Sequence, residues 1–342
     1  MPLTPAETPP SSLEEPKAPA NARIAVLTSG GDAPGMNACI RAVVRTAKYR
    51  GCDVLGVIRG FWGLIDDRFQ PLTSRDVGNI IQRGGTILET SRCKPFLEAE
   101  GRRKAAENIK RHGIQGLIVI GGDGSFRGAE ALSQEHEIRV VGVPGTIDND
   151  LYGTDYTIGY DTATNTALSA IDRLRDTAFS HERLFFVEVM GRNSGFIALE
   201  AGIAGGAEDV VVPESETDVD ALCRAIQGAL SRGKKGLIVV VAEGDEGGGA
   251  LALAEKVKAR INLDYRVTVL GHMQRGGSPT ARDRIRASRL GVAAVEALLE
   301  GKDRIMVGTQ AGRILHVPLQ DTYEKRRPFD FDLLRMVQML AG

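Results

Sequence analysis

The chain has little of what several protein classes require. Aromatic residues make up only 5% of its 342 residues, and 43 lysines and arginines nearly cancel 44 aspartates and glutamates, which leaves a net charge of -1. This balance excludes a general electrostatic attraction to nucleic acid or to an anionic membrane. Any phosphate group must therefore be bound by local sites, and we expect neither a nucleic-acid partner nor a membrane partner.

Cysteine is also scarce. The chain is long enough to bury its own core, which excludes a small zinc-stapled or disulfide-stapled scaffold. The four cysteines form no CxxC pair and lie near no histidine cluster; they are Cys39, Cys52, Cys93 and Cys223. No apolar run approaches the roughly 20 residues needed to cross a bilayer. The N-terminus lacks the basic start and apolar stretch of a secretion signal. We therefore expect reduced thiols in a protein that stays in the cytoplasm.

Glycine, by contrast, is abundant, with 41 residues in the chain, well above the roughly 7% of average usage. This favours tight turns and close backbone approaches. At roughly 150 residues per domain, the length predicts about two domains. Residues 1–22 hold six of the 14 prolines, a composition that is typical of a disordered tail.

From Ile24 onward, short apolar runs alternate with glycine-rich loops and stretches of helical spacing such as Ala163, Ala167 and Ile171. The runs are 24–27, 54–58, 117–120, 139–143, 184–189, 210–212, 237–241 and 267–270. Such runs are typical of strands buried on both faces of a parallel sheet. The alternation predicts an α/β fold of two doubly wound units, with a switch near Tyr160 and a closing segment after Gly276 that returns to the first unit.

Two glycine-rich loops follow predicted strands, where ligands bind in such sheets. TSGGDAPGMN (28–37) precedes a helix predicted to begin near Met36, and GGDGSFRG (121–128) follows the run 117–120. Backbone N–H groups of the first loop could face an anion, and a tight strand-to-helix turn is the alternative explanation of that loop. The glycine spacing of the second loop is weak evidence by itself. No GxxxxGK[ST] sequence occurs, so neither loop is a Walker loop.

Carboxylates stand in or beside these loops. Asp123 lies inside a loop otherwise shaped for phosphate, which favours a magnesium ligand over a capping carboxylate. Asp148 and Asp150 stand two residues apart, and in an extended chain they project to the same side. One can then hold metal through water while the other accepts a proton from a hydroxyl nucleophile. A turn rich in aspartate and asparagine is the alternative explanation.

Basic residues follow two further strands. Arg192 lies in MGRNSGF (190–196), and His272 and Arg275 lie in GHMQRGGSP (271–279). Arginine suits bidentate phosphate recognition, whereas surface solvation is the usual fate of a single arginine. Glu243 directly follows another run and could accept hydrogen bonds from sugar hydroxyls.

Five motifs, in this order and spacing, carry a resemblance to a known family: TSGGDAPGMN, GGDGS, PGTIDND, MGR and GHMQRGGSP. They resemble the ATP-dependent 6-phosphofructokinases of bacterial type, over residues 23–340. The resemblance implies phosphorylation of fructose 6-phosphate at its C1 hydroxyl to fructose 1,6-bisphosphate, the committed step of glycolysis, with ATP and Mg²⁺. It also implies a homotetramer and two Rossmann-like three-layer domains with the active site in the cleft between them: 23–160 plus about 276–325 for ATP and magnesium, and 161–275 plus about 326–342 for fructose 6-phosphate.

The resemblance further implies roles for individual residues. ATP would be held by Gly31, Arg92, Cys93, Gly122, Asp123, Gly124 and Ser125, and the metal by Asp123 and Asp150. Asp148 would be the catalytic base, with Thr146 alongside and with Arg92 and Arg192 neutralising charge on the transferring phosphoryl group. The sugar phosphate would be bound by Thr146, Ile147, Asp148, Met190, Gly191, Arg192, Glu243, His272, Met273, Gln274 and Arg275, joined by Arg183 and Arg266 of a neighbouring subunit.

Two glycines bear on the phosphoryl donor. The related pyrophosphate-using enzymes have GGDD and PKTIDND, whereas Gly124 and Gly145 stand at those positions here, which favours ATP. An effector site for ADP or phosphoenolpyruvate would use Arg41, Arg45, Arg175, Glu208, Arg232 and Lys234. One arginine expected there falls on Ser74, beside Arg75, and Cys93 replaces a residue that is often aromatic near adenosine.

Two alternatives stay open at this point. GGDG also occurs in NAD kinases and diacylglycerol kinases, which would mean a different acceptor, but MGR and GHMQRGGSP do not fit those enzymes. A non-enzymatic nucleotide sensor would be favoured if Asp148 or Arg192 were missing, and both are present.

Overall fold

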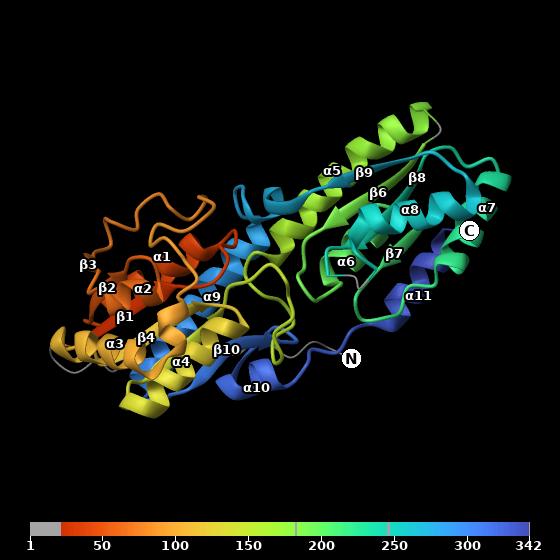
Figure 1. Ribbon diagram of the computed structural model, residues 1–342. Coiled ribbons are helices and arrows are strands. Elements are labelled where there is room, and N and C mark those ends of the chain that lie inside the picture. Colours follow the sequence, from red (N-terminus) through yellow and green to blue (C-terminus); the bar gives the residue numbers. More distant parts are fainter. Residues whose placement is uncertain (1–21, 182, 245–246, 342) are drawn as a thin grey trace, which may run out of the picture.

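The computed structural model describes residues 22–181, 183–244 and 247–341, which form two β-sheets covered by helices (Figure 1). The larger sheet has the order β11-β10-β5-β4-β1-β2-β3. Its strands are β1 (Arg23–Thr28), β2 (Asp53–Val57), β3 (Phe69–Leu72), β4 (Gly116–Gly121), β5 (Val140–Pro144), β10 (Ile305–Gln310) and β11 (Arg313–Pro318). Only the edge strands β3 and β11 pair antiparallel; the inner strands are parallel.

Side chains alternate between the two faces of this sheet, as the period of a β-strand requires. Ile24 and Val26 pack toward one set of helices, and Ala25 and Leu27 toward another. The first set is α1 (Met36–Tyr49) and α9 (Ala281–Leu299). The second is α2 (Phe61–Ile65), α3 (Ala99–Arg111), α4 (Asp123–His136) and α10 (Leu319–Glu324), with the short 3₁₀ helix η1 (Lys94–Leu97) beside them. The larger sheet is thus the middle of three layers.

The smaller sheet repeats this plan with four parallel strands in the order β7-β8-β6-β9. They are β6 (Leu184–Val189), β7 (Asp209–Val211), β8 (Leu237–Ala242) and β9 (Tyr265–Val269), and the 3₁₀ helix η2 (Gly271–Arg275) follows β9. One face carries α5 (Tyr160–His181), α6 (Phe196–Ala204) and α11 (Phe331–Leu340). The other carries α7 (Val219–Ser231) and α8 (Gly249–Ile261). The predicted α/β class with two doubly wound units is therefore confirmed.

The chain connects the two sheets more than once. After β5 it enters the long helix α5, which packs against α6 on the small sheet and against α9 (Figure 1). After Gly276 it lies again against the larger sheet, where α9 packs on α1 and β10 pairs with β5. A last segment leads from α10 to α11 on the small sheet. One apolar cluster includes strand residues of both sheets, among them Val143 and Val187.

The eight predicted strands all occur, with ends shifted by at most two residues. The prediction that each is buried on both faces is wrong for β9, where Val269 is 60% exposed. The reason is that β9 pairs only with β6 and forms an edge of the small sheet. Strands β3, β10 and β11 were not predicted, because polar residues interrupt their apolar patterns.

Three further expectations concern the N-terminal tail, the cysteines and membrane-spanning helices. The predicted tail lies outside the described residues except for Ala22, which is buried in the core. All four cysteines are free thiols, and three of them are buried. None of the helices in the described ranges combines the length and apolarity needed to span a bilayer.

Candidate active site

The loops after β1 and β4 meet at the carboxyl edge of the larger sheet, where its strand order reverses. The backbone N–H of Ser29 donates to the carbonyl of Ile120 at 3.0 Å. A Cβ placed on Gly121 would lie 2.6 Å from Oγ of Ser125 and 2.7 Å from the carbonyl oxygen of Ser29. This close packing needs a glycine. The adjoining N-terminus of α4 begins at Asp123 and leaves backbone N–H groups free to bind an anion.

The loop after β1 also meets η2 of the smaller sheet. Nη1 of Arg275 donates to the carbonyl oxygen of Asp32 at 3.2 Å. A Cβ on Gly31 would lie only 2.5 Å from that same Nη1. The absence of a side chain at Gly31 therefore allows the guanidinium to lie against the loop, and the ligand-facing edges of the two sheets come together here.

Asp148 follows β5 and is only 7% exposed. Its backbone N–H donates to Oγ1 of Thr146 at 3.2 Å, and its carbonyl accepts from Oγ of Ser194 at 2.7 Å. Its carboxylate oxygen Oδ1 is buried and has no hydrogen-bond partner among the described residues. The backbone of Asp148 is thus fixed while its carboxylate keeps an unused acceptor.

Burial raises the pKa of Asp148. Arg275 and Arg192 lower this pKa, and Glu243 and Asp123 raise it. These charges come from loops of both sheets. Asp148 therefore lies where the two sheets meet, in a charge-balanced surrounding with little water.

Asp150 has the more strongly shifted carboxyl group. Burial, followed by the charges of Asp148 and Asp123, raises its pKa to about 7. A carboxyl group whose ionised form is disfavoured by two neighbouring carboxylates in this way is stabilised by a cation.

Arg192 joins the edges of the two sheets. It follows β6, adopts a left-handed backbone conformation with φ of 57°, and donates its backbone N–H to Oε1 of Glu243 at 2.8 Å. Its Nη1 lies 3.3 Å from Oδ1 of Asp123. The site therefore holds a cationic head beside the carboxylate at the start of α4, with the buried carboxylate of Asp148 nearby.

The donor set fits magnesium. Among the described residues no cluster of three or more acidic, histidine or cysteine side chains is arranged to enclose a metal ion. Magnesium, however, commonly binds through one or two carboxylates and completes its shell with water and substrate phosphates. The unpaired Oδ1 of Asp148 and the raised pKa of Asp150 both indicate a carboxylate group without its counter-charge.

Comparison with known proteins adds the family. A family model described as Phosphofructokinase matches residues 23–298. The chain belongs to the phosphofructokinase family. It is 59% identical over 319 residues to the ATP-dependent 6-phosphofructokinase 1 of Thermus thermophilus, which covers 93% of this chain and 99% of that relative. It is 53% identical over 319 residues to ATP-dependent 6-phosphofructokinase 2 of Bacteroides thetaiotaomicron, covering 93% of this chain and 98% of that one.

Solved phosphofructokinases share the fold. The structure of phosphofructokinase from Saccharomyces cerevisiae matches with a TM-score of 0.84 and 38% identity, over 89% of this chain and 45% of that longer chain. The pyrophosphate-dependent phosphofructokinase of Marinobacter aquaeolei matches with a TM-score of 0.79 and 25% identity, over 92% of this chain and 91% of that one. A phosphofructokinase that is named as pyrophosphate-dependent thus shares this architecture.

The other residues implied by the family resemblance differ in how deeply they are buried. Ile147 is fully buried in the apolar core, so only its backbone can face a ligand. Gln274 is fully buried and accepts the backbone N–H of Met190 at 2.8 Å, while its Nε2 has no partner in the described part of the chain. Arg92, His272 and Met273 are exposed. Cys93 packs partly against the core, and burial raises the pKa of its thiol.

Arg183 and Arg266 lie away from these residues. Arg183 precedes β6, and Arg266 pairs with Phe185 near the start of the same strand. Arg192 follows the other end of β6, and a strand of this length spans about 20 Å. Within one chain, the structure therefore does not bring these two arginines to Asp148.

The candidate effector residues fall into two groups. Arg41 and Arg45 lie on α1. On the small sheet, Lys234 pairs with Glu208 at 2.8 Å, Arg175 donates to the carbonyl of Gly206 at 2.7 Å, and Arg232 donates to the carbonyl of Ala341 at 3.3 Å. Glu208 and Arg232 line a pocket of about 340 Å³. Ser74 and Arg75 are both exposed.

Sequence reasoning missed three residues that hold the Asp148 turn: Thr157, Ser194 and Arg327. Ser194 lies within MGRNSGF (190–196), but nothing in that motif indicates that its hydroxyl binds the Asp148 carbonyl. Arg327 stands in the basic stretch KRRPF, which is typical of a solvated surface. Nothing in that pattern distinguishes it from its neighbours.

Proposed function

We propose that this phosphofructokinase transfers the γ-phosphoryl group of ATP to the C1 hydroxyl of fructose 6-phosphate, giving fructose 1,6-bisphosphate and ADP, the committed step of glycolysis. The observation that carries the proposal is the buried Asp148, whose free carboxylate oxygen lies near Arg192 and Asp123. The names of the similar bacterial enzymes support the same substrates and donor.

In this mechanism Asp148 acts as general base. It accepts the proton of the C1 hydroxyl as the C1 oxygen forms its bond to the γ-phosphorus, and the bridging oxygen leaves with ADP. A carboxylate whose pKa is raised by burial is a stronger proton acceptor than a solvated one. Arg192, with Arg92, stabilises the negative charge of the transferring group, and such electrostatic stabilisation contributes several kcal/mol of barrier lowering. Thr146 stands alongside the base.

Asp123 and Asp150 would hold Mg²⁺. When bound, the ion would shield the phosphate charge of ATP. Gly31, Cys93, Gly122, Gly124 and Ser125 would leave room for the nucleotide. On the other side, Met190, Gly191, Glu243, His272 and Arg275 would bind the sugar phosphate.

The two glycines that distinguish donors have different surroundings. A Cβ on Gly124 would meet no atom within 4 Å, so a longer side chain there would extend into open space beside the start of α4. A Cβ on Gly145 would lie 2.8 Å from Cγ2 of Ile120. Gly124 leaves space for the nucleotide, as an ATP enzyme needs, whereas a side chain at position 145 is disfavoured by packing against Ile120.

We also propose the assembly and its regulation. Residues 23–160 plus about 276–325 would form the ATP domain, and 161–275 plus about 326–342 the fructose 6-phosphate domain. A cytoplasmic homotetramer would supply Arg183 and Arg266 from a neighbouring subunit to each site. ADP or phosphoenolpyruvate would bind between subunits, at Arg41, Arg45, Arg175, Glu208, Arg232 and Lys234.

An assay of fructose 1,6-bisphosphate formation, coupled to its cleavage and to NADH oxidation, tests the function. It is run with ATP and with pyrophosphate, each with and without magnesium. We expect turnover only with ATP and magnesium. Product formed with pyrophosphate instead would overturn the donor assignment. No product with either donor, from protein that binds ATP, would favour a different acceptor or a nucleotide sensor.

A further inference from the structure

The turn between Asp148 and Asp150 has an unusual backbone at its centre. Asn149 has φ of 56°, in the left-handed region that side chains other than those of asparagine and aspartate rarely adopt. It is 1% exposed. A buried turn in this conformation persists only when its surroundings hold it, so the contacts of Asn149 determine where the flanking carboxylates point.

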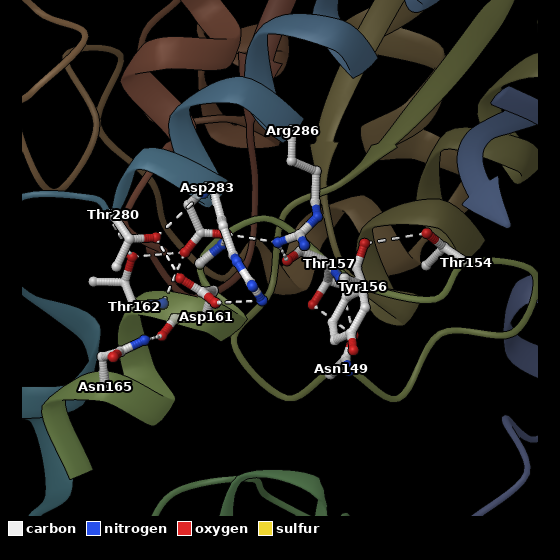
Figure 2. Close-up of polar contacts among 12 residues, drawn as sticks. Asn149, Thr154, Tyr156, Thr157, Asp161, Thr162, Asn165, Thr280, Asp283 and Arg286 are labelled. Atoms are coloured by element: carbon white, nitrogen blue, oxygen red, sulfur yellow. Dashed lines mark hydrogen bonds and ion pairs between the residues drawn. The ribbon is translucent and has the colours of Figure 1, made fainter. Parts of the chain in front are cut away.

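One set of contacts comes from Thr157 in the loop between β5 and α5, which α9 supports. Oδ1 of Asn149 accepts the backbone N–H of Thr157 at 2.9 Å, and Oγ1 of Thr157 donates to the carbonyl of Thr146 at 2.5 Å. Figure 2 shows Asn149 and Thr157 near Arg286. Nη1 of Arg286 donates to the carbonyl of Thr157 at 3.4 Å and to Oδ1 of the buried Asp283 at 2.9 Å. Asp283 in turn accepts the backbone N–H of Thr162 at 2.8 Å. This side anchors the turn through Thr157.

The opposite anchor is Arg327, in the segment between α10 and α11. Its Nη1 donates to the carbonyl oxygen of Asn149 at 2.8 Å. Its guanidinium lies 4.4 Å from the centre of the Phe196 ring, at the first residue of α6. The preceding residue, Arg326, forms an antiparallel bridge with Leu151. The crossing segment therefore contacts the turn through both its backbone and one cationic side chain.

Several features show that Arg327 is firmly held itself. Burial lowers its pKa, while Tyr160, Glu200, Tyr156 and Asp155 raise it. The Tyr160 hydroxyl also donates to the carbonyl of Phe196 at 2.9 Å. A guanidinium packed on a ring with its N–H directed at one carbonyl is a rigid donor, unlike the exposed side chain of Arg326.

We propose that Arg327 is a positioning residue, which holds the Asp148 carboxylate in place for proton transfer through the carbonyl oxygen of Asn149. The inference rests on the proposed function of Asp148. The carbonyls of Asp148 and Asn149 are both bound, by Ser194 and Arg327 respectively. Without Arg327 the second carbonyl is left buried and unpaired, and the turn can rotate about Asn149. A displacement of about 1 Å in a reacting group can cost on the order of 100-fold in rate.

Arg327→Met tests the role, because methionine keeps an apolar stem against Phe196 and removes the donor. Arg326→Met is the matched control, since Arg326 is exposed on the same segment. We expect kcat to fall at least about tenfold in Arg327→Met with KM for both substrates within about twofold, and the control to match wild type. Arg327→Lys, which keeps a cationic donor, should recover part of the loss. Activities are compared per folded protein, well below the melting temperature.

A double-mutant cycle separates positioning from general support. If Arg327 acts through Asp148, then Arg327→Met should cost less than about threefold in kcat in an Asp148→Asn background. A full tenfold loss in that background would overturn the proposal, and so would wild-type kcat in folded Arg327→Met. Should the methionine variant fail to fold, Arg327→Leu, which also lacks the donor, takes its place, and wild-type kcat in that folded variant overturns the proposal as well. An inactive wild-type enzyme, by contrast, would refute the proposed function itself.

Discussion

Nη1 of Arg192 lies 3.3 Å from Oδ1 of Asp123, so one ion pair joins the loop after β6 to the start of α4. The two side chains are 60% and 36% exposed, and pairs this exposed contribute little to stability. We therefore explain the pair by substrate binding. A magnesium ion would replace Arg192 as the partner of Asp123, and a phosphoryl group would replace Asp123 as the partner of Arg192.

Removing the proposed base should abolish chemistry and spare binding. In Asp148→Asn we expect kcat to fall at least about 100-fold, because a positioned general base contributes about 10² to 10⁴. KM for fructose 6-phosphate should stay within about threefold, since the amide occupies the same volume. Steady-state kinetics with saturating ATP and magnesium measures both. Near-normal kcat would remove Asp148 from the mechanism.

Asp150 should make the metal-free protein less stable as the pH rises. Its folded pKa is raised to about 7 from an ordinary value of 3.8, so between these values the folded state binds more protons than the unfolded state. The free energy of unfolding then falls as pH rises through this window.

Asp150→Asn should remove this dependence. The variant should match wild type near pH 4 and exceed it at pH 8, by up to about 4 kcal/mol. Urea unfolding at both pH values in a chelator provides the measurement. Adding magnesium at pH 8 should narrow the gap by stabilising wild type. An equal difference at both pH values would show that Asp150 is not the titrating group.

Most of the fold could be predicted from the sequence, because buried parallel strands consist of continuous runs of apolar residues. It failed for β10 and β11, where Gly308, Gln310 and Arg313 interrupt the pattern, and for the edge position of β9, since pairing partners leave no local trace. Asp123, Asp148 and Arg192 were predicted from loops after strands. Arg327 was not, because its role depends on a tertiary contact to a backbone carbonyl that no spacing encodes.

Gly124→Asp should impair ATP use much more than pyrophosphate use. The new side chain would enter open space, so the fold is kept, and its carboxylate would crowd and repel the inner phosphates of the nucleotide. We expect kcat/KM for ATP to fall on the order of 100-fold, about 3 kcal/mol. Parallel assays with the two donors measure the ratio.

Gly145→Ala serves as the contrast for that experiment. A Cβ there would press on Ile120, so we expect a loss of about 1 to 3 kcal/mol in unfolding free energy with little change in the donor ratio. Unchanged ATP kinetics in Gly124→Asp would refute the argument from these glycines.

Subunit mixing should test the shared site. Arg266 is exposed at the far end of the small sheet from Arg192, so Arg266→Ala and Asp148→Asn would damage different halves of each site. Co-refolding the two inactive variants should restore a measurable fraction of wild-type activity. Mixing Asp148→Asn with Arg192→Ala is the control. Both residues come from the same chain in each site, so no site in the mixture has both of them intact, and this mixture should recover less activity. No recovery in the first mixture would count against a shared site.

A methyl group at Gly31 should weaken sugar-phosphate binding through Arg275. The added Cβ would lie 2.5 Å from Nη1 of Arg275, and the end of a flexible side chain is what yields in such a contact. Gly31→Ala should therefore leave stability within about 0.5 kcal/mol of wild type and raise KM for fructose 6-phosphate roughly fivefold, about 1 kcal/mol. In an Arg275→Ala background the same methyl group should raise that KM no further. An increase that persists there would mean that Gly31 acts on the substrate site by another route.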